Sequence, residues 1–194
     1  DIAAAPGSKT TQIASLMNNT GIIMANDPDY LRLKALSINI QRCGVINTII
    51  TNMQGHKFKN LQFDKILVDA PCSGTGVIRK SPQTPLMWNP HMIKKLAGMQ
   101  KQLITTAFEN LKETGTLVYS TCSLEPEENE GVINDLLKNF NNAKVEKIDL
   151  KIKRSSPILE FEKETYDSSI KECLRLWPQD NDTEGFFVAK IRKV

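Results

Sequence analysis

The stretch DKILVDAPCSGTG, residues 64–76, runs from an apolar segment directly into an aspartate, a proline and a cysteine. A short apolar run bounded by turn residues is typical of a buried strand, so we predict a strand over residues 64–68. That strand would deliver Asp69 and Cys72 to its carboxyl end. The question it raises is why a cysteine follows there, among small residues.

A second stretch, LVYSTCS at residues 117–123, repeats the arrangement. A strand over residues 116–120 would deliver Cys122 among small hydroxyl-bearing residues. In open α/β sheets, ligands bind outside the carboxyl ends of the strands. Two thiols at the ends of two such strands therefore mark one candidate site.

The rest of the chain alternates apolar runs with longer amphipathic stretches, which is typical of βαβ units and a mainly parallel sheet. The other predicted strands cover residues 21–25, 45–51, 144–150 and 185–191. The predicted helices cover residues 9–17, 29–43 and 90–112, and a further one begins at Pro126, where the carboxylates of Glu127, Glu128 and Glu130 would complement its positive end. We predict an α/β fold in one domain, residues 1–194.

Composition sets the broad class. The 194 residues are 40% hydrophobic and 24% charged, and no apolar run approaches the ~20 residues that a membrane span needs. A net charge of +3 permits a nucleic-acid partner without arguing for one. Four cysteines without CxxC spacing, and only two histidines, favour free thiols, no metal site and a cytoplasmic protein.

The first ten residues, DIAAAPGSKT, form a turn that leads into a helix. Ser8 separates Gly7 from Lys9, so the spacing of a phosphate-binding P-loop is not met, and a dinucleotide fingerprint needs three glycines. Asp27 ends the next strand about 20 residues after Gly7, where an acidic residue can accept hydrogen bonds from ribose hydroxyls. Together these features favour an adenosine-containing cofactor, although a structural turn and a surface aspartate remain the alternatives.

The chain begins at Asp1 with a loop-like segment and no apolar strand before it. We therefore expect a fragment whose natural N-terminus and first strand are missing.

Five motifs, in order along the chain, carry a resemblance to a known family. They are DIAAAPGSKT (1–10), AND (25–27), DAPCSGTG (69–76), YSTCS (119–123) and RLWPQDNDTEGFFVAK (175–190). The chain resembles the Sun family of RNA cytosine-C5 methyltransferases, particularly its archaeal members. The resemblance implies a Rossmann-like S-adenosylmethionine (AdoMet) domain with a mainly parallel, seven-stranded-type sheet and one antiparallel strand. It also implies an RNA substrate, with tRNA favoured over rRNA.

The resemblance also implies the residues that bind AdoMet. Asp27 would hold the ribose, and the loop from Ala3 to Lys9 would pass beside the methionine portion. The residues implied are Ala3, Ala4, Ala5, Pro6, Gly7, Lys9, Asp27, Arg32, Gln54, Asp69 and Pro71. The family usually has a carboxylate where this chain has Gln54, so we expect weaker cofactor binding there. The amide oxygen of Gln54 could still accept from an adenine amino group.

The chemistry explains why two thiols are needed. C5 of cytosine is a poor nucleophile, so a thiolate first adds to C6 and makes C5 able to accept a methyl group. The C5 proton must then leave so that the enzyme is released by elimination. By the resemblance, Cys122 is the nucleophile and Cys72 assists release. Asp69 is placed to hydrogen-bond the cytosine, while Lys9 would orient the base or lower a thiol pKa, with a salt bridge as its alternative.

Two rival functions remain at this stage. A DNA cytosine-C5 methyltransferase would use Cys72, in its Pro-Cys motif, as the nucleophile, and the Thr-Cys-Ser stretch at Cys122 speaks against it. The other rival is an idle RNA-binding scaffold, suggested by Gln54. We expect the two remaining cysteines, Cys43 and Cys173, to be buried and inert.

Overall fold

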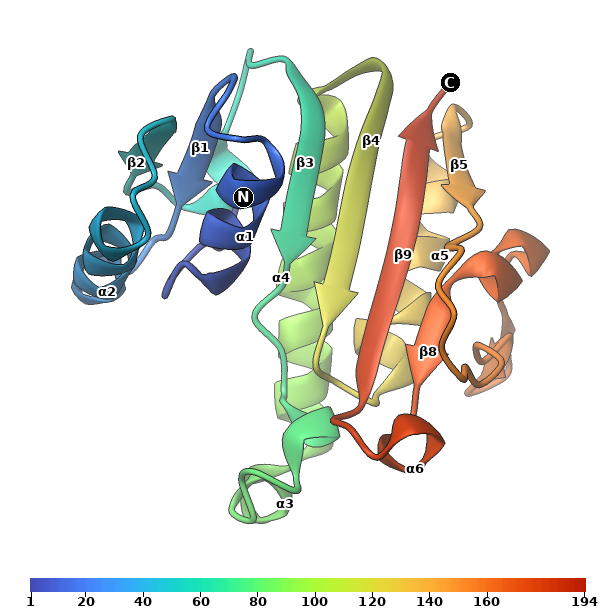
Figure 1. The fold of residues 1–194 in the computed structure, drawn as a ribbon. Coiled ribbons are helices and arrows are strands. Elements are labelled where there is room, and N and C mark those ends of the chain that lie inside the picture. The colour runs from blue at the N-terminus through green and yellow to red at the C-terminus, as the bar shows by residue number, and fades with distance from the viewer.

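The computed structural model describes all residues from 1 to 194. Its main strands are β1 (Ile23–Asn26), β2 (Thr48–Thr51), β3 (Phe63–Asp69), β4 (Leu111–Thr121), β5 (Ala143–Glu146), β8 (Leu174–Leu176) and β9 (Phe186–Lys193). β1 pairs with β2, and a second ladder runs in the order β3-β4-β9-β5, with β8 on β9 (Figure 1). β1 is parallel to β2 and β3 to β4, whereas β9 is antiparallel to its neighbours. The predicted α/β fold, with one antiparallel strand in the sheet, is confirmed.

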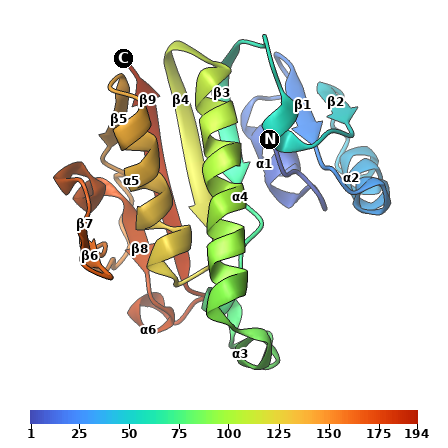
Figure 2. The same ribbon diagram turned by 180° about the vertical axis from the view of Figure 1, so that it is seen from behind.

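Two long helices cover one face of the sheet. The α-helices of the whole chain are α1 (Ser8–Leu16), α2 (Tyr30–Arg42), α3 (Thr84–Met87), α4 (Pro90–Glu109), α5 (Glu130–Asn139) and α6 (Pro178–Asn181). α4 and α5 lie side by side over β3, β4 and β9 (Figure 2). Because side chains alternate along a strand, every second residue of β9 enters the core beneath them: Phe187, Ala189 and Ile191 are fully buried. No helix has the length and apolar character needed to cross a membrane.

The sequence shows why α2 and α4 begin where they do. The Asp29 side chain accepts hydrogen bonds from the first turn of α2, and Asn89 caps α4 in the same way. Pro90 is the first residue of α4, where a missing N–H costs nothing. These caps satisfy main-chain amide groups in the first turn of both helices.

The register of β3 and β4 brings the two cysteine segments together. Asp69, the last residue of β3, lies opposite Ser120 of β4. Cys72 and Cys122 therefore leave the sheet from adjacent strands, at the same edge. This is the arrangement that the two apolar runs predicted.

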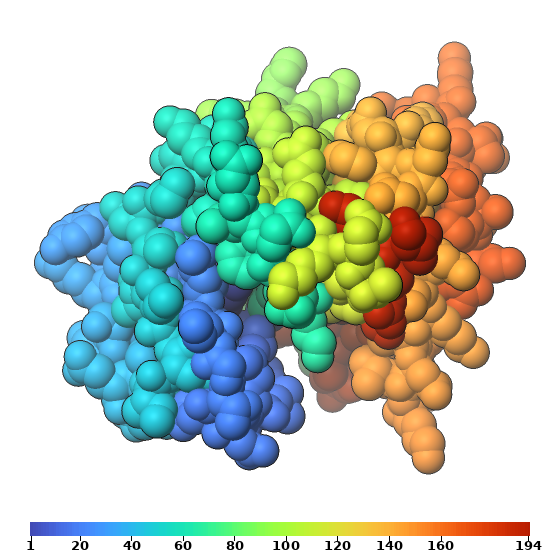
Figure 3. Space-filling view, turned by 90° about the horizontal axis from the view of Figure 1, so that it is seen from above, coloured from blue at the N-terminus to red at the C-terminus, as the bar shows by residue number.

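The first four residues lie between β1 and β3. The Ile2 amide donates to the Leu67 carbonyl of β3, and the Asn26 amide of β1 donates to the Asp1 carbonyl. Figure 3 shows the blue and cyan first third of the chain packed against the green and yellow middle. β1 and β3 form no ladder with each other, so residues 1–4 carry the hydrogen bonds between the two parts of the sheet. The expectation that a first strand is missing stays a prediction.

Several predicted boundaries were wrong. The strand predicted over 144–150 ends at Glu146, where its pairing with β9 stops. The helix predicted to reach residue 112 ends at Glu109, because β4 already begins at Leu111. Pro126 opens only a short 3-10 turn before α5. The short elements that sequence patterns missed are β6 (Glu160–Phe161), β7 (Glu164–Thr165), η1 (Gly55–Lys57), η2 (Thr75–Val77), η3 (Pro126–Glu128) and η4 (Ser168–Glu172), besides α3, α6 and β8.

Candidate active site

The two predicted cysteines face each other at the ends of β3 and β4. The sulfur atoms of Cys72 and Cys122 lie 3.1 Å apart, which is hydrogen-bonding and not covalent distance. Both are free thiols and partly buried. Close approach of the chain is required here, because a Cβ on Gly76 would lie 2.6 Å from the Cys122 carbonyl oxygen.

The two thiols are not equivalent. The hydrogen bond from Cys72 is the largest cause that lowers the pKa of Cys122 to about 7, and the Lys9 charge acts in the same direction, against burial and the negative charge of Asp69. The same hydrogen bond, burial and the negative charge of Glu128 raise the pKa of Cys72 above its ordinary value. The hydrogen bond between the two sulfur atoms, and not the surrounding charges, is therefore what favours a thiolate at Cys122 and a protonated thiol at Cys72.

Asp69 and Lys9 form an ion pair beside the thiols. The Lys9 ammonium donates to Asp69 Oδ2 at 2.6 Å, and the Ser120 hydroxyl donates to Oδ1 at 2.7 Å. Lys9 also lies 5.7 Å from the centre of the Phe186 ring. Both side chains of the pair remain partly exposed, so they are accessible to a base that approaches the two thiols. The alternative of a salt bridge for Lys9 is confirmed, and it does not remove Lys9 from the site.

Glu128 is an acidic group that lies inside the protein. The sequence placed it at the positive start of a helix, and in the structure it is completely buried behind the two cysteines. Its carboxylate accepts from the Ser73 amide and the Ser123 hydroxyl, the residues that follow the two thiols. An acidic cluster reads as a solvated face in sequence, and only packing reveals which carboxylate turns inward.

The predicted cofactor loop packs tightly on α2. Gly7 has a φ of +109°, and a Cβ there would lie 2.9 Å from the Leu36 side chain, so both backbone shape and space require glycine. The loop is tied to the next strand, since the Ala4 amide donates to the Asn26 carbonyl and the Ala5 amide to Asp27 Oδ2. Ala3, Pro6 and Lys9 belong to the same turn.

Asp27 is at the predicted end of its strand, but the chain itself occupies it. Its carboxylate is fully buried, accepts from the Ala5 and Asp29 amides, and pairs with Arg32 at 3.2 Å. Arg32 also donates to the Ala5 carbonyl, and its side chain is half exposed. The carboxylate of Asp27 is thus held by the chain itself, and Arg32 is the partly exposed member of this cluster.

The two other predicted cofactor contacts are open. Gln54 follows β2 with an exposed side chain that makes no hydrogen bond, so its amide is free to meet a ligand. Pro71 is exposed, and its carbonyl accepts from the buried Gln100. The strand ends thus present a carboxylate, a free amide and a glycine turn, which fit a nucleoside cofactor. Their role as binding residues stays a prediction.

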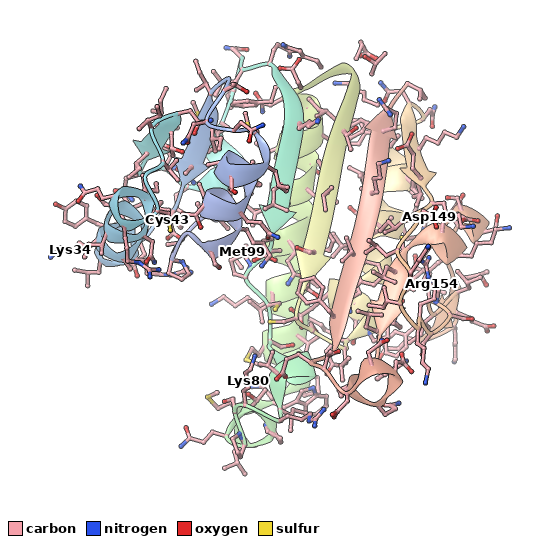
Figure 4. All side chains as sticks on the ribbon, viewed as in Figure 1. Lys34, Cys43, Lys80, Met99, Asp149 and Arg154 are labelled. Atoms are coloured by element: carbon pink, nitrogen blue, oxygen red, sulfur yellow. The ribbon has the colours of Figure 1, made fainter.

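The remaining cysteines differ from each other. Cys173 is fully buried, as expected, and burial raises the pKa of its thiol. Cys43 is exposed, so the expectation of a buried thiol was wrong for it; it lies beside α1 and α2, apart from the paired thiols (Figure 4). No cluster of three or more His, Cys, Asp or Glu side chains is arranged to hold a metal ion.

Comparison with known proteins agrees with the geometry. The tRNA (cytosine(49)-C(5))-methyltransferase of Pyrococcus abyssi is 45% identical over 195 residues, covering all of this chain and 62% of that protein. The ribosomal RNA small subunit methyltransferase F of Serratia proteamaculans is 43% identical over 196 residues, covering all of this chain and 39% of that protein. The chain therefore spans less than two thirds of the length of these relatives.

A solved structure supports the same fold. The crystal structure of NSun6 from Pyrococcus horikoshii with SFG has a TM-score of 0.86 at 36% identity, over 99% of this chain and 46% of that one. SFG is an analogue of AdoMet. The Rossmann-like fold expected from the motifs is thus confirmed. The family model described as 16S rRNA methyltransferase RsmB/F matches residues 1–192, so the chain belongs to this family of AdoMet-dependent RNA methyltransferases.

Proposed function

We propose that this chain is a single catalytic domain, residues 1–194, that methylates C5 of cytosine in RNA with AdoMet as methyl donor. The observation that carries the proposal is the thiol pair, in which one sulfur has a lowered pKa and its neighbour a raised one. A covalent mechanism needs this division, because one group must attack while the other must keep its proton until later.

Cys122 is the nucleophile in this proposal. With a pKa of about 7, roughly half of Cys122 is thiolate at neutral pH, and the thiolate is the reactive form. Its sulfur adds to C6 of cytosine, which places electron density on C5. When bound, AdoMet would supply the methyl group from its sulfonium centre to C5. The products are the methylated adduct and S-adenosylhomocysteine.

Cys72 then assists release. Its pKa is raised above all by the hydrogen bond that it makes with Cys122. Once the Cys122 sulfur is bonded to C6, it carries no charge and no longer holds the Cys72 proton. Cys72 can then release that proton to solvent and, as a thiolate, accept the proton from C5, so that the C6–S bond breaks and its electron pair returns to Cys122.

The ion pair would orient the cytosine. Asp69 and Lys9 lie on the side of Cys122, as both charges act on the pKa of its thiol. A carboxylate can accept from the amino group of cytosine, and an ammonium can donate to its carbonyl oxygen. The cofactor would lie along the loop of residues 3–9, with its ribose on Asp27 and its adenine near Gln54.

The favoured substrate is tRNA. The relative with 45% identity over this whole chain is named for cytosine 49 of tRNA, whereas the Serratia relative is named for ribosomal RNA. The rival with Cys72 as nucleophile is disfavoured by the direction of its pKa shift, since a protonated thiol attacks poorly.

The test is a denaturing gel for covalent protein–RNA adducts, with AdoMet and unmodified bulk tRNA. We expect Cys72→Ala to accumulate an adduct, because methylation proceeds and release stalls, while Cys122→Ala forms none. Cys43→Ala, a change at the exposed thiol, is the matched control and should behave as the unmodified chain does. An adduct with Cys122→Ala and none with Cys72→Ala would reverse the two roles.

A further inference from the structure

We propose that Glu128, together with Gln100, is the positioning residue that fixes Cys72 opposite Cys122. The inference rests on the proposed function and deepens it, because it assigns the separation of the two thiols to a buried carboxylate that never touches the substrate. Glu128 and Gln100 are both fully buried, so they act through the loops and not on the RNA.

We call Glu128 and Gln100 together the clamp. On the Cys72 side, the clamp binds both neighbours of this residue in the chain. The amide of Ser73 donates to Glu128 Oε2 at 3.0 Å. The Gln100 amide group donates to the same Oε2 at 2.7 Å and to the Pro71 carbonyl at 2.8 Å. The residue before Cys72 and the residue after it are therefore tied to one oxygen atom.

On the Cys122 side, the other carboxylate oxygen holds the next residue. The Ser123 hydroxyl donates to Glu128 Oε1 at 2.8 Å and lies 3.0 Å from the Ser73 hydroxyl. The two oxygens of one carboxylate thus connect the loop after β3 with the loop after β4. A change at Glu128 would loosen both loops at once.

The clamp is itself supported from behind. The Tyr119 hydroxyl donates to the main-chain carbonyl of Glu128 at 2.6 Å. Asn129 accepts from the Thr121 hydroxyl and donates to the Ser123 carbonyl. All of these groups are buried, so the backbone that carries Glu128 has little freedom to adjust.

The groups around Glu128 match a carboxylate better than an amide. Glu128 accepts from an amide N–H, a hydroxyl and a carboxamide NH₂. A glutamine of the same shape would have to aim its NH₂ at the Ser123 hydroxyl, which must then turn its own proton away, because the opposite orientation leaves the Ser73 N–H and Gln100 without an acceptor in a buried place. Turning Gln100 over would meet the new NH₂ but would face its oxygen towards the Pro71 carbonyl.

The charge of Glu128 acts in the same direction as its geometry. The titratable groups that face the thiols are Lys9 and Asp69 near Cys122, and Glu128 and Tyr119 near Cys72. Removing the charge of Glu128 lowers the pKa of Cys72, while loosening the loops removes the hydrogen bond that lowers the pKa of Cys122. The difference between the two thiols therefore shrinks from both sides.

The experiment measures the pH midpoint for alkylation of each cysteine by iodoacetamide, resolved by peptide mass spectrometry. In Glu128→Gln we expect the Cys122 midpoint to rise by about one pH unit, towards that of an ordinary thiol. The exposed Cys43 is the internal reference and should not move. Glu127→Gln, the same change at a carboxylate that makes no hydrogen bond, is the matched control and should leave all midpoints unchanged.

A second variant guards against misfolding. Gln100→Met removes the bridge to Pro71 with little change of length, and we expect a shift in the same direction. Each variant should also show a lower kcat on RNA with an unchanged KM. Unchanged Cys122 midpoints in folded protein would overturn the proposal, whatever happens to methylation. If the parent chain does not methylate RNA but the Cys122 midpoint shifts as expected in the two variants, the proposed function fails and the proposal for Glu128 and Gln100 stands.

Discussion

Two arginine–carboxylate pairs stand at opposite ends of the site and differ in how firmly they are held. Arg175 and Glu130, behind the loop that follows Cys122, join through two hydrogen bonds of 2.6 and 2.7 Å and are almost fully buried. Arg32 reaches Asp27 at 3.2 Å from a side chain that is half exposed.

The difference indicates which part of the site is ready before ligands bind. Near the cysteines, buried groups already hold the two thiols in place, which is how a site lowers the cost of reorganisation during reaction. At the proposed cofactor edge, Asp27 is paired with the half-exposed Arg32, and a ligand that uses this carboxylate would have to displace that side chain. Three predictions follow the contrast, beginning with the largest effect.

The first prediction concerns the buried pair of Arg175 and Glu130. Glu130→Gln leaves Arg175 buried without its partner, and removal of one member of a buried ion pair costs about 3–5 kcal/mol of stability. Arg175 also donates to the Leu124 carbonyl, so the loop after Cys122 should loosen with it. Urea unfolding measures the loss.

The control for this change is Glu164→Gln, at the exposed pair of Glu164 with Lys138, which should cost under about 1 kcal/mol. Equal losses in the two variants would show that the buried pair does not support the cysteine side of the site.

The second prediction tests whether the cysteine side is poised without ligands. Because the lowered pKa of Cys122 is about 7, kcat/KM should rise with pH up to that value and level off above it. Below it, the thiolate fraction falls about tenfold for each pH unit, and the rate should fall with it. A rate profile from pH 5 to pH 9 measures the midpoint. A midpoint at or above pH 8.5 would mean that the thiol pair does not activate Cys122.

The third, and smallest, sharpens the picture of the cofactor edge. Gln54→Glu changes an exposed amide into a carboxylate of the same shape, which restores the acidic character usual at this position in the family. A charge-assisted hydrogen bond to the adenine amino group should tighten AdoMet binding about three- to tenfold. Calorimetric titration measures it, with Gln54→Ala as the variant that should bind more weakly. No gain with Gln54→Glu would place the adenine away from this residue.

Much of the site was readable in the sequence. The apolar runs before Asp69 and Cys122 predicted adjacent parallel strands, and the thiols do meet, because neighbouring parallel strands end at one edge. The first ten residues were also predicted to form a turn, and Gly7 in that turn has a positive φ. Periodicity gave no elements between residues 150 and 181, where short strands and turns depend on partners far away in the chain, whereas the last strand, predicted over 185–191, is β9.

Only the tertiary structure decided which charged groups turn inward. Glu127, Glu128 and Glu130 look alike in the sequence, yet Glu128 and Glu130 are completely buried and Glu127 is not. Likewise Asp27 was placed correctly at a strand end. Its ion pair with Arg32, however, depends on side-chain contacts across two elements.

The sequence by itself determined the fold class, the strands that end in candidate site residues and the identity of the two thiols. These depend on local patterns and on motif spacing. The tertiary structure alone decided their protonation and their distance. A pKa depends on every charge and hydrogen bond nearby, and those neighbours, such as Lys9, Glu128 and Gln100, come from separate parts of the chain.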